Sequence, residues 1–448
     1  MEPMEGNTMD ASKSKAVSTK QQRIAKLAKQ SPEMSITSLN HYLDLAWMKE
    51  AYSEVRKDSA PGVDRQTVVQ YGERLEENLR SLISRAKSGD YFAPPVRRVY
   101  LPKGKGKEPR AIGVPTTEDK VLQRAVTMVL EPIYEQDFLD CSYGFRPGRS
   151  THQALAALWK QVMGMGIQWI LDVDIQKFFD TLNRAQLREL LKRRVCDGVI
   201  TKTIGKWLNA GVLEQGTLHY PKGGTPQGGV ISPMLSNVYL HYVLDEWFAN
   251  EVKPRLKGKA FMTRFCDDFV IGFEKREDAE RVQRVLPKRF GRYGLTIHPE
   301  KTCLLPFGRP NGKGRKQSGT FDFLGFTHYW GKSRKGQWVV KRKTASKRFG
   351  RGLKRIAEWC RKNRHRAIKE QHSALSRKLK GHYTYYGITG NGLSLQKFKD
   401  EVGKVWRKWL ARRSRERESM PWERFNRLIR HRPLPPVRIV QPICAAKP

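Results

Sequence analysis

A short apolar segment with two acids on one face constrains the fold of this chain more than any other feature. In WILDVDI (residues 169–175) the side chains alternate, so that Asp172 and Asp174 lie on the same face of a predicted strand. Burying a carboxylate in a sheet is costly unless a cation meets it. The segment therefore predicts a strand whose acidic end binds a cation, with Asp174 as the ligand and Asp172 in a supporting position.

A second acidic feature lies further along the chain, between two apolar runs. The segment AFMTRFCDDFVIGF (260–273) predicts a β-hairpin with Asp267 and Asp268 at its turn. An Asp-Asp pair alone more often caps a turn than binds metal. Mg²⁺ prefers oxygen ligands, however, and two such ions about 4 Å apart commonly run phosphoryl transfer. Together with Asp174, the pair predicts a catalytic site with two Mg²⁺ ions.

The net charge indicates a polyanionic partner. The chain has 85 Lys and Arg against 44 Asp and Glu, a formal net charge of +41. Such a surface repels itself unless a polyanion neutralises it, and nucleic acid is the most common such partner. The excess is uneven, because residues 331–448 hold 34 Lys and Arg against 7 Asp and Glu. We expect this C-terminal part to be the main surface that binds phosphates.

Several classes of protein are disfavoured. The six cysteines are scattered without a C-x-x-C pair, which argues against a disulfide framework and against a zinc knuckle. No apolar run reaches the roughly 20 residues of a membrane span, and the first residues lack the apolar core of a signal peptide. We therefore expect a soluble protein of a reducing cytoplasm that has no membrane partner.

Ordered segments along the chain resemble the motifs of reverse transcriptases. DIQKFFDTLN (174–183) is similar to the first catalytic motif, and RFCDDFVIGF (264–273) to the second, which usually has Tyr-Ala before its acids. GGTPQGGVISPMLSNVYLHYVLD (223–245) is similar to the motif whose Gln meets the incoming nucleotide. The other matches are APGVD (60–64), VRRVYLPKGKGKEPRAIGVP (96–115), SYGFRPGRSTHQAL (142–155), GLTIHPEKT (294–302) and FDFLGF (321–326).

The combination is most similar to the reverse transcriptase/maturases encoded in bacterial group II introns. Retroviral enzymes lack the APGVD and GFRPGRS segments. The basic helices expected after residue 340, which include LKGHYTYYG (379–387), resemble that family's thumb, also called the maturase or X domain. Paired cysteines or clustered histidines of an HNH endonuclease are not found near the C-terminus. The chain thus resembles the endonuclease-lacking lineages, of which class C is the best known.

The resemblance implies the architecture. We expect an α+β protein with a right-hand polymerase fold, in which residues 36–330 form fingers and palm on an antiparallel sheet. Residues 331–448 are expected to form an all-helical, basic thumb. Residues 1–35 are basic and polar without clear periodicity, so the sequence predicts a flexible N-terminal arm.

The resemblance also implies roles for single residues. Asp174, Asp267 and Asp268 would hold the two Mg²⁺ ions and carry the catalysis. Six basic, aromatic or amide residues are candidates for contact with the nucleotide. The basic positions are Lys103 and Arg110 on a predicted hairpin, with Arg97 as a further candidate; the others are Phe178, Phe179 and Gln227.

The two phenylalanines compete for one role. In the family, a bulky aromatic residue four or five positions after the first Asp excludes a 2′-OH. The spacing favours Phe179, and Phe178 is expected in the core, since such a pair after a strand is more often core than not. Phe265-Cys266 stands where Tyr-Ala is usual, a change that removes no metal ligand.

The function implied is an RNA-directed DNA polymerase that uses dNTPs, an RNA template and a DNA primer. It would also bind its group II intron RNA to assist splicing, and a DNA target for retrohoming by target-primed reverse transcription. Two alternatives are a domesticated reverse transcriptase, for example in defence, and a maturase acting mainly as an RNA-binding splicing cofactor. A third, an RNA-templated RNA polymerase, shares the acids, but a sugar gate at Phe179 argues against it.

Overall fold

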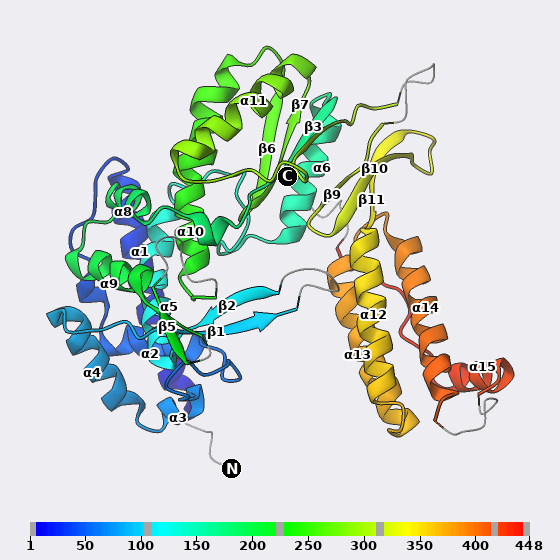
Figure 1. The fold of residues 1–448 in the computed structure, drawn as a ribbon, viewed down its shortest axis with the longest axis horizontal. Coiled ribbons are helices and arrows are strands. Elements are labelled where there is room, and N and C mark those ends of the chain that lie inside the picture. The colour runs from blue at the N-terminus through cyan, green and yellow to red at the C-terminus, as the bar shows by residue number, and fades with distance from the viewer. Residues whose placement is uncertain are drawn as a thin grey trace.

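Three sheets organise the chain, as the computed structural model in Figure 1 shows. The residues described are 6–102, 109–214, 216–220, 228–310, 318–413 and 420–441, with side chains from residue 15 onward. In chain order, the sheets belong to the fingers, the palm and the junction between palm and thumb. This arrangement is the right-hand, α+β fold that the sequence predicts.

Helices make up most of the fingers. They are α1 (Gly6–Gln30), α2 (Leu45–Glu54), α3 (Val68–Gly72), α4 (Leu75–Ser88), α5 (Thr117–Tyr134), α8 (Arg184–Lys192) and α9 (Gly198–Asn209), with a 3₁₀ turn, η1 (Asn40–Tyr42). Helix α5 is the central one, because nearly all its apolar side chains are buried and both α1 and α2 pack against it. A Thr116 cap and two acids in its first turn fix where α5 begins.

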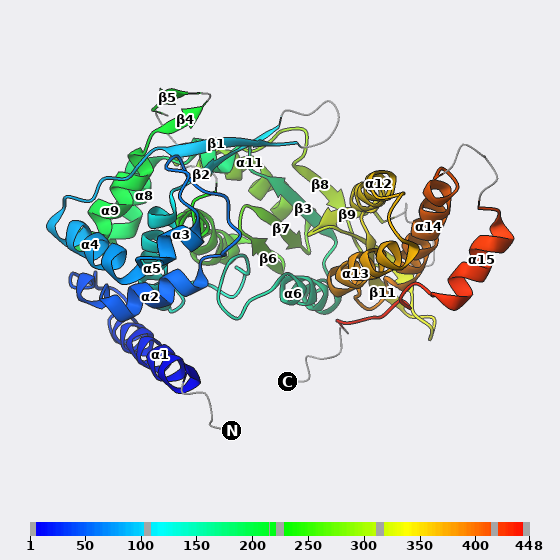
Figure 2. The same ribbon diagram turned by 90° about the horizontal axis from the view of Figure 1, so that it is seen from below.

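The N-terminal segment differs from the flexible arm predicted over residues 1–35. It forms the long helix α1, which lies against α5 and projects from the fingers in Figure 2. Its buried side chains are Val17, Ile24 and Ala28, a single stripe at helical spacing. The stripe is narrow and its neighbours are polar, so the composition of the segment does not indicate a packed helix.

The fingers sheet has the order β2-β1-β4-β5. Its strands are β1 (Val96–Leu101), β2 (Arg110–Val114), β4 (Val212–Glu214) and β5 (Thr217–His219). The predicted hairpin of β1 and β2 is confirmed, with Leu101 paired to Arg110 next to the segment that connects the two strands. Strand β4 joins β1 in parallel, so this sheet is mixed and separate from the palm sheet.

The palm is an antiparallel sheet in the order β6-β7-β3-β8. Its strands are β3 (Trp169–Asp174), β6 (Ala260–Phe265), β7 (Asp268–Phe273) and β8 (Cys303–Pro306). The helices of this region are α6 (Thr151–Gly164), α7 (Phe178–Thr181), α10 (Ser232–Leu240) and α11 (Arg276–Arg292), with the π-helical turns η2 (His241–Asp245) and η3 (Trp247–Val252) and a 3₁₀ turn, η4 (Lys253–Arg255). The sheet lies between α11 and α6 in Figures 1 and 2, so its middle strands are covered on both faces.

A third sheet, in the order β11-β10-β9, leads into the thumb. Its strands are β9 (Phe321–Phe323), β10 (Phe326–Lys332) and β11 (Trp338–Thr344), and the thumb helices are α12 (Ser346–Lys362), α13 (Ile368–Tyr386), α14 (Gly392–Leu410) and α15 (Trp422–His431). The prediction of an all-helical region from residue 331 is therefore wrong for its first part. Strands β10 and β11 pair over seven residues each, which buries Val340 and other apolar side chains against α6.

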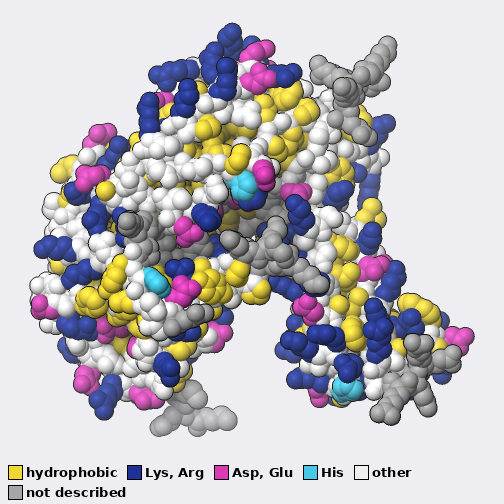
Figure 3. Space-filling view, in the orientation of Figure 1, with side chains coloured by type: hydrophobic (Ala, Val, Ile, Leu, Met, Phe, Trp, Pro, Cys, Tyr) yellow, Lys and Arg dark blue, Asp and Glu magenta, His cyan; other side chains and the backbone are white. Residues whose placement is uncertain are grey.

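The thumb helices enclose a core of their own. Apolar side chains of these helices face it, including Ile356 of α12 and Val402 and Trp406 of α14. Lys and Arg side chains cover much of the outer surface of this lobe, and a hollow separates it from the fingers (Figure 3). In the part of the chain that the structure describes, no helix combines the length and apolar character needed to cross a membrane.

Candidate active site

The three predicted aspartates meet at one end of the palm sheet. Asp174 is the last residue of β3 and lies directly opposite Asp268, the first residue of β7. Phe265 of β6 pairs with Asp268 of β7, so Cys266 and Asp267 form the two-residue turn between these strands. Adjacent antiparallel strands therefore bring together two acids that are 94 positions apart in the chain.

The turn that carries the acids is conformationally unusual. Cys266, its first residue, has a φ of +60°, in the left-handed region that favours glycine. A positive φ at the first of two loop residues is the pattern of a type II′ turn, which suits the twist of a hairpin. A non-glycine residue in this conformation stores strain, and the surrounding structure must hold it in place.

Negative charge is concentrated at this end of the sheet. Although part of the Asp268 side chain is open to solvent, desolvation by the surrounding protein raises its pKa to about 7. The charges of Asp267 and Asp174 add to this rise. Burial likewise raises the pKa of Asp172 to about 7, with contributions from Asp268 and Asp174. Acids that disfavour one another's ionisation in this way would gain from a bound cation.

A lysine that sequence analysis did not single out neutralises part of this charge. Lys301 Nζ lies 2.6 Å from Asp174 Oδ2, and both side chains are about half exposed. Thr302 Oγ1 accepts a hydrogen bond of 3.3 Å from the Asp174 backbone N–H. Among the described residues, no three His, Cys, Asp or Glu side chains are gathered around a single point as metal ligands. The backbone thus assembles the three acids, and Lys301 supplies the cation that Asp174 contacts.

The two phenylalanines after Asp174 occupy different environments. Phe178 is buried at 2% exposure, whereas Phe179 is only partly buried, and the rings meet edge to face at 5.4 Å. Lys177, with a φ of +47°, bends the chain between β3 and these residues. The arrangement agrees with the spacing argument that gives Phe178 to the core and leaves Phe179 accessible.

The basic candidates lie in two different settings. Arg110, at the start of β2, is near enough to Asp267 to lower its pKa against the larger, opposing effect of burial. Arg97 donates hydrogen bonds of 3.1 and 2.7 Å to the carbonyl oxygen of Pro61, so its guanidinium holds the APGVD segment. Lys103 and Gln227 lie outside the described residues.

The thumb reaches the same site. Arg348, in the first turns of α12, is close enough to Asp268 to counter part of the rise in its pKa. The hydroxyl of Tyr385 in α13 donates a 2.8 Å hydrogen bond to the carbonyl oxygen of Leu324, between β9 and β10. Helix α12 thus lies near the acids, and α13 is tied to the sheet that joins the palm to the thumb.

Comparison with known proteins identifies relatives of this chain. The family model described as reverse transcriptase (RNA-dependent DNA polymerase) matches residues 101–328, which include all three aspartates. The group II intron-encoded protein LtrA of Lactococcus lactis is 37% identical over 213 residues, covering 48% of this chain. Protein YkfC of Escherichia coli is 33% identical over 287 residues, covering 57% of this chain.

The extent of these matches differs. The aligned part spans 31% of the length of LtrA and 75% of YkfC. A protein in the cob intron of Schizosaccharomyces pombe is 37% identical over 205 residues, or 44% of this chain and 25% of that protein. Two of these three relatives are named for introns.

Proposed function

The chain belongs to the reverse transcriptase family, and from this premise we propose that it is an RNA-directed DNA polymerase that also binds a group II intron RNA. In this role it assists splicing and carries out retrohoming by target-primed reverse transcription. The observation that carries the proposal is the pairing of Asp174 with Asp268, beside Asp267, at the open end of the palm sheet. Relatives named for group II and other introns support the RNA partner.

The proposed cofactor is Mg²⁺, as two ions held by Asp174, Asp267 and Asp268. Reverse transcriptases depend on divalent metal, and the residues fit, because they offer only carboxylate oxygens, and desolvation together with the charges of Asp267 and Asp174 raises the pKa of Asp268 to about 7. Bound ions would supply charge neutralisation for the attacking and leaving oxygens. Lys301 is the cation in contact with Asp174 in this structure, and it would have to give way for Asp174 to act as a ligand.

Four residues are proposed to hold the incoming dNTP. Arg110 acts near Asp267, where a triphosphate would lie, and Lys103 is proposed to join it from the same hairpin. Phe179 is proposed to contact the sugar and exclude a 2′-OH, and Gln227 to contact the nucleotide. Arg97 has a positioning role in this scheme, since it bonds to Pro61.

The nucleic acids are proposed to bind across the hollow between fingers and thumb. An RNA template paired to a DNA primer would place its end at the acids, while the basic thumb grips phosphates. The net charge of +41 supports a large polyanion such as the intron RNA and a DNA target. The site of action is proposed to be the cytoplasm of a bacterium.

Primer extension tests the proposed activity. A DNA primer on an RNA template should be extended with dNTPs in the presence of Mg²⁺, and omission of the metal should stop the reaction. Extension with rNTPs should be slower by a factor of about 100 or more, since a gating contact of a few kcal/mol corresponds to such a ratio. Equal use of rNTPs would favour an RNA polymerase, and a lack of extension under all conditions would exclude the proposed activity.

A further inference from the structure

A fully buried arginine lies at the base of the turn that carries Asp267 and Asp268. Arg264, near the end of β6, has a side chain that is 0% exposed. A buried guanidinium is tolerated only when its charge is paired and its donors are satisfied. Arg264 meets this condition completely, because all five of its N–H groups have an acceptor.

Four residues supply these acceptors. Arg264 Nε and Nη2 donate to the two carboxylate oxygens of Asp245 at 2.8 and 2.5 Å. Nη2 also donates to Ser142 Oγ at 2.8 Å, and Nη1 donates to Asn237 Oδ1 at 3.0 Å. Nη1 also donates to the carbonyl oxygen of Cys266 at 3.0 Å. One hydrogen bond of a buried ion pair is thus aimed at the catalytic turn itself.

Separate parts of the palm converge on this arginine. Asp245 is also 0% exposed and belongs to η2, a π-helical turn that continues α10; such turns are rare and frequently occur at functional sites. Asn237 lies in α10 and donates a 2.6 Å bond from Nδ2 to the carbonyl oxygen of Gly144. The Arg264 backbone is held as well, since its N–H donates to Cys141 O and its carbonyl accepts from Tyr143 N–H.

The loop around Gly144 closes the other side of the turn. A Cβ atom on Gly144 would lie 2.5 Å from the backbone nitrogen of Cys266, a separation that real side chains do not show. The turn is therefore clamped between Gly144 and the Arg264 guanidinium. Cys266 needs such a clamp, because its φ of +60° is unfavourable for a residue with a side chain.

We propose that Arg264 and Asp245 are positioning residues, which fix the Cys266 peptide and thereby direct the Asp267 and Asp268 carboxylates toward Asp174. Neither residue touches substrate. The inference rests on the proposed function, since it assigns these residues a part in DNA synthesis. A pair that served only the fold would not need a donor on the turn carbonyl, and its loss would affect stability and not metal binding.

The variant Arg264→Lys tests the proposal. Lysine keeps the charge but has three donors in place of five, so it cannot hold Asp245, Asn237 and the Cys266 carbonyl together. The matched control is Arg289→Lys on α11. Arg289 also donates to two backbone carbonyls, those of Val243 and Tyr242, but these lie outside the turn.

Three measurements are compared with the unmodified protein: kcat and KM for the primer–template, Mn²⁺ binding followed by electron paramagnetic resonance, and thermal unfolding. Arg264→Lys should lower kcat by about tenfold or more, leave KM within about twofold, and weaken Mn²⁺ binding by about threefold or more. Arg289→Lys should leave kcat, KM and Mn²⁺ binding within about twofold. Folded Arg264→Lys protein with unchanged kcat and Mn²⁺ affinity would overturn the proposal.

The Mn²⁺ titration separates this inference from the proposed function. If the unmodified protein does not extend primers, the proposed function fails, and weakened Mn²⁺ binding in Arg264→Lys still supports the positioning role. If Arg264→Lys does not fold, Asn237→Ala decides, because it keeps the ion pair and removes only the amide that aims Nη1 and holds Gly144. Its kcat and Mn²⁺ affinity should fall, and a folded variant with neither change contradicts the proposal.

Discussion

At the scale of single residues, Phe178 and Phe179 are adjacent in the chain but differ in exposure. Phe179→Val should increase the incorporation of rNTPs relative to dNTPs by about tenfold or more, because a smaller side chain leaves room for a 2′-OH. Single-nucleotide extension with dNTP and rNTP in parallel measures the ratio. The melting temperature should change little, since the Phe179 side chain is only partly buried.

The neighbouring variant is the control. Phe178→Ala should cost about 3–5 kcal/mol of unfolding free energy, because it leaves a cavity in the core. Its ratio of rNTP to dNTP use should stay unchanged in the protein that remains folded. The assignment of Phe179 as the sugar gate is wrong if selectivity moves with Phe178 and not with Phe179.

A buried acid in the fingers predicts a pH dependence of stability. Asp119 is 2% exposed, accepts a hydrogen bond from Tyr91, and burial raises its pKa to about 7. In the unfolded chain an Asp ionises near pH 4, so between about pH 4 and pH 7 the folded state binds the additional proton. This group's contribution to stability therefore falls as the pH rises through that window and is constant above it.

Asp119→Asn removes this titration while it keeps the shape of the side chain. The melting temperature of the variant minus that of the unmodified protein should become more positive by several degrees between about pH 5 and pH 8. Thermal unfolding by circular dichroism at a series of pH values measures the difference. A difference that is independent of pH would show that Asp119 titrates normally.

Residue-level prediction from sequence was possible where local pattern carries the signal. The alternation around Asp174 and the apolar runs around Asp267 and Asp268 are local, and the structure brings these acids together. Lys301 is 127 positions from its partner Asp174, and Arg264 is 122 positions from Ser142. Such pairs depend on how strands and loops are placed in the fold, so no local periodicity indicates them.

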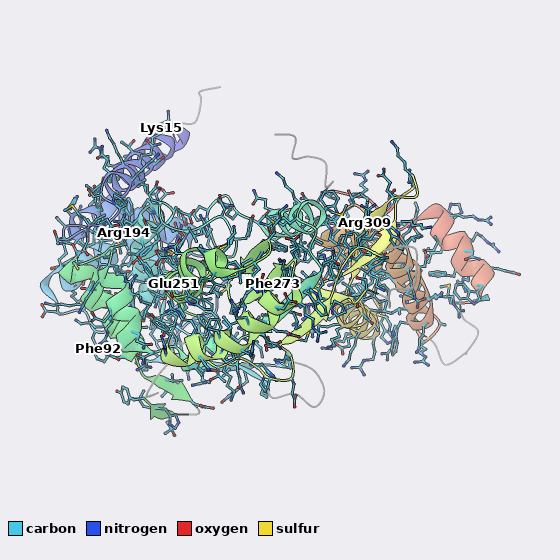
Figure 4. All side chains as sticks on the ribbon, turned by 90° about the horizontal axis from the view of Figure 1, so that it is seen from above. Lys15, Phe92, Arg194, Glu251, Phe273 and Arg309 are labelled. Carbon is cyan, nitrogen blue, oxygen red and sulfur yellow. The ribbon has the colours of Figure 1, made fainter. Side chains whose placement is uncertain are left out.

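At the scale of elements, α1 is a helix that the sequence periodicity did not predict, and contacts with the fingers hold its C-terminal end. Arg194, labelled in Figure 4 beside the end of α1, is 2% exposed. Its guanidinium donates to four backbone carbonyls, those of Ala28, Ser31, Pro32 and Met34, and to Asp137 Oδ2 at 2.8 Å. The last carbonyls of a helix lack partners within it, and the arginine satisfies one of them, that of Ala28, while its other carbonyl contacts hold the segment that follows α1.

Arg194→Met should release this helix. It leaves the half-buried Asp137 carboxylate unpaired and should cost about 3–5 kcal/mol of unfolding free energy. Amide hydrogen exchange within Gly6–Gln30 should become faster by about tenfold or more. The control is Arg193→Met, because the Arg193 side chain is 57% exposed and stacks on Tyr242. Equal effects of the two variants would exclude an anchoring role for Arg194.

Secondary-structure elements were likewise predictable where the local pattern is strong and not where distant contacts determine them. The hairpin of β6 and β7 lies within the predicted segment 260–273, because its two apolar runs are clear and the acids interrupt them. Strands β10 and β11 were not predicted, since neither alternates cleanly and both lie in a segment whose overall charge resembles the helices that follow. Composition indicates the class of a region, but it does not show that β11 packs against α6.

At the scale of the whole molecule, the thumb combines a basic surface with a position next to the acids. The sequence predicts the charge of residues 331–448, and the structure adds that α12 brings Arg348 close to Asp268. Charge alone could not indicate this, because the approach depends on the sheet that joins palm to thumb. This placement supports the proposal that the thumb holds nucleic acid whose end lies at the three acids.

Charge reversal on α12 tests this role. Lys347, Arg351 and Arg355 are exposed, and changing all three to Glu should weaken RNA binding. The slope of log K against log salt should fall by about 2–3, because each lost phosphate contact removes about 0.7–0.9. The matched control reverses the exposed Arg281, Arg284 and Lys288 on α11, which removes the same charge. Equal changes in slope would mean that net charge, and not the thumb, determines RNA binding.

The central claim is that Asp174, Asp267 and Asp268 form the catalytic centre of a polymerase whose RNA-binding surface lies elsewhere. The most direct measurement is extension of a DNA primer on an RNA template with dNTPs and Mg²⁺, by the unmodified protein and by the double variant Asp267→Ala, Asp268→Ala. The variant should lose detectable extension while its RNA affinity stays within about threefold. Extension at the unmodified rate by folded double-variant protein would contradict the account.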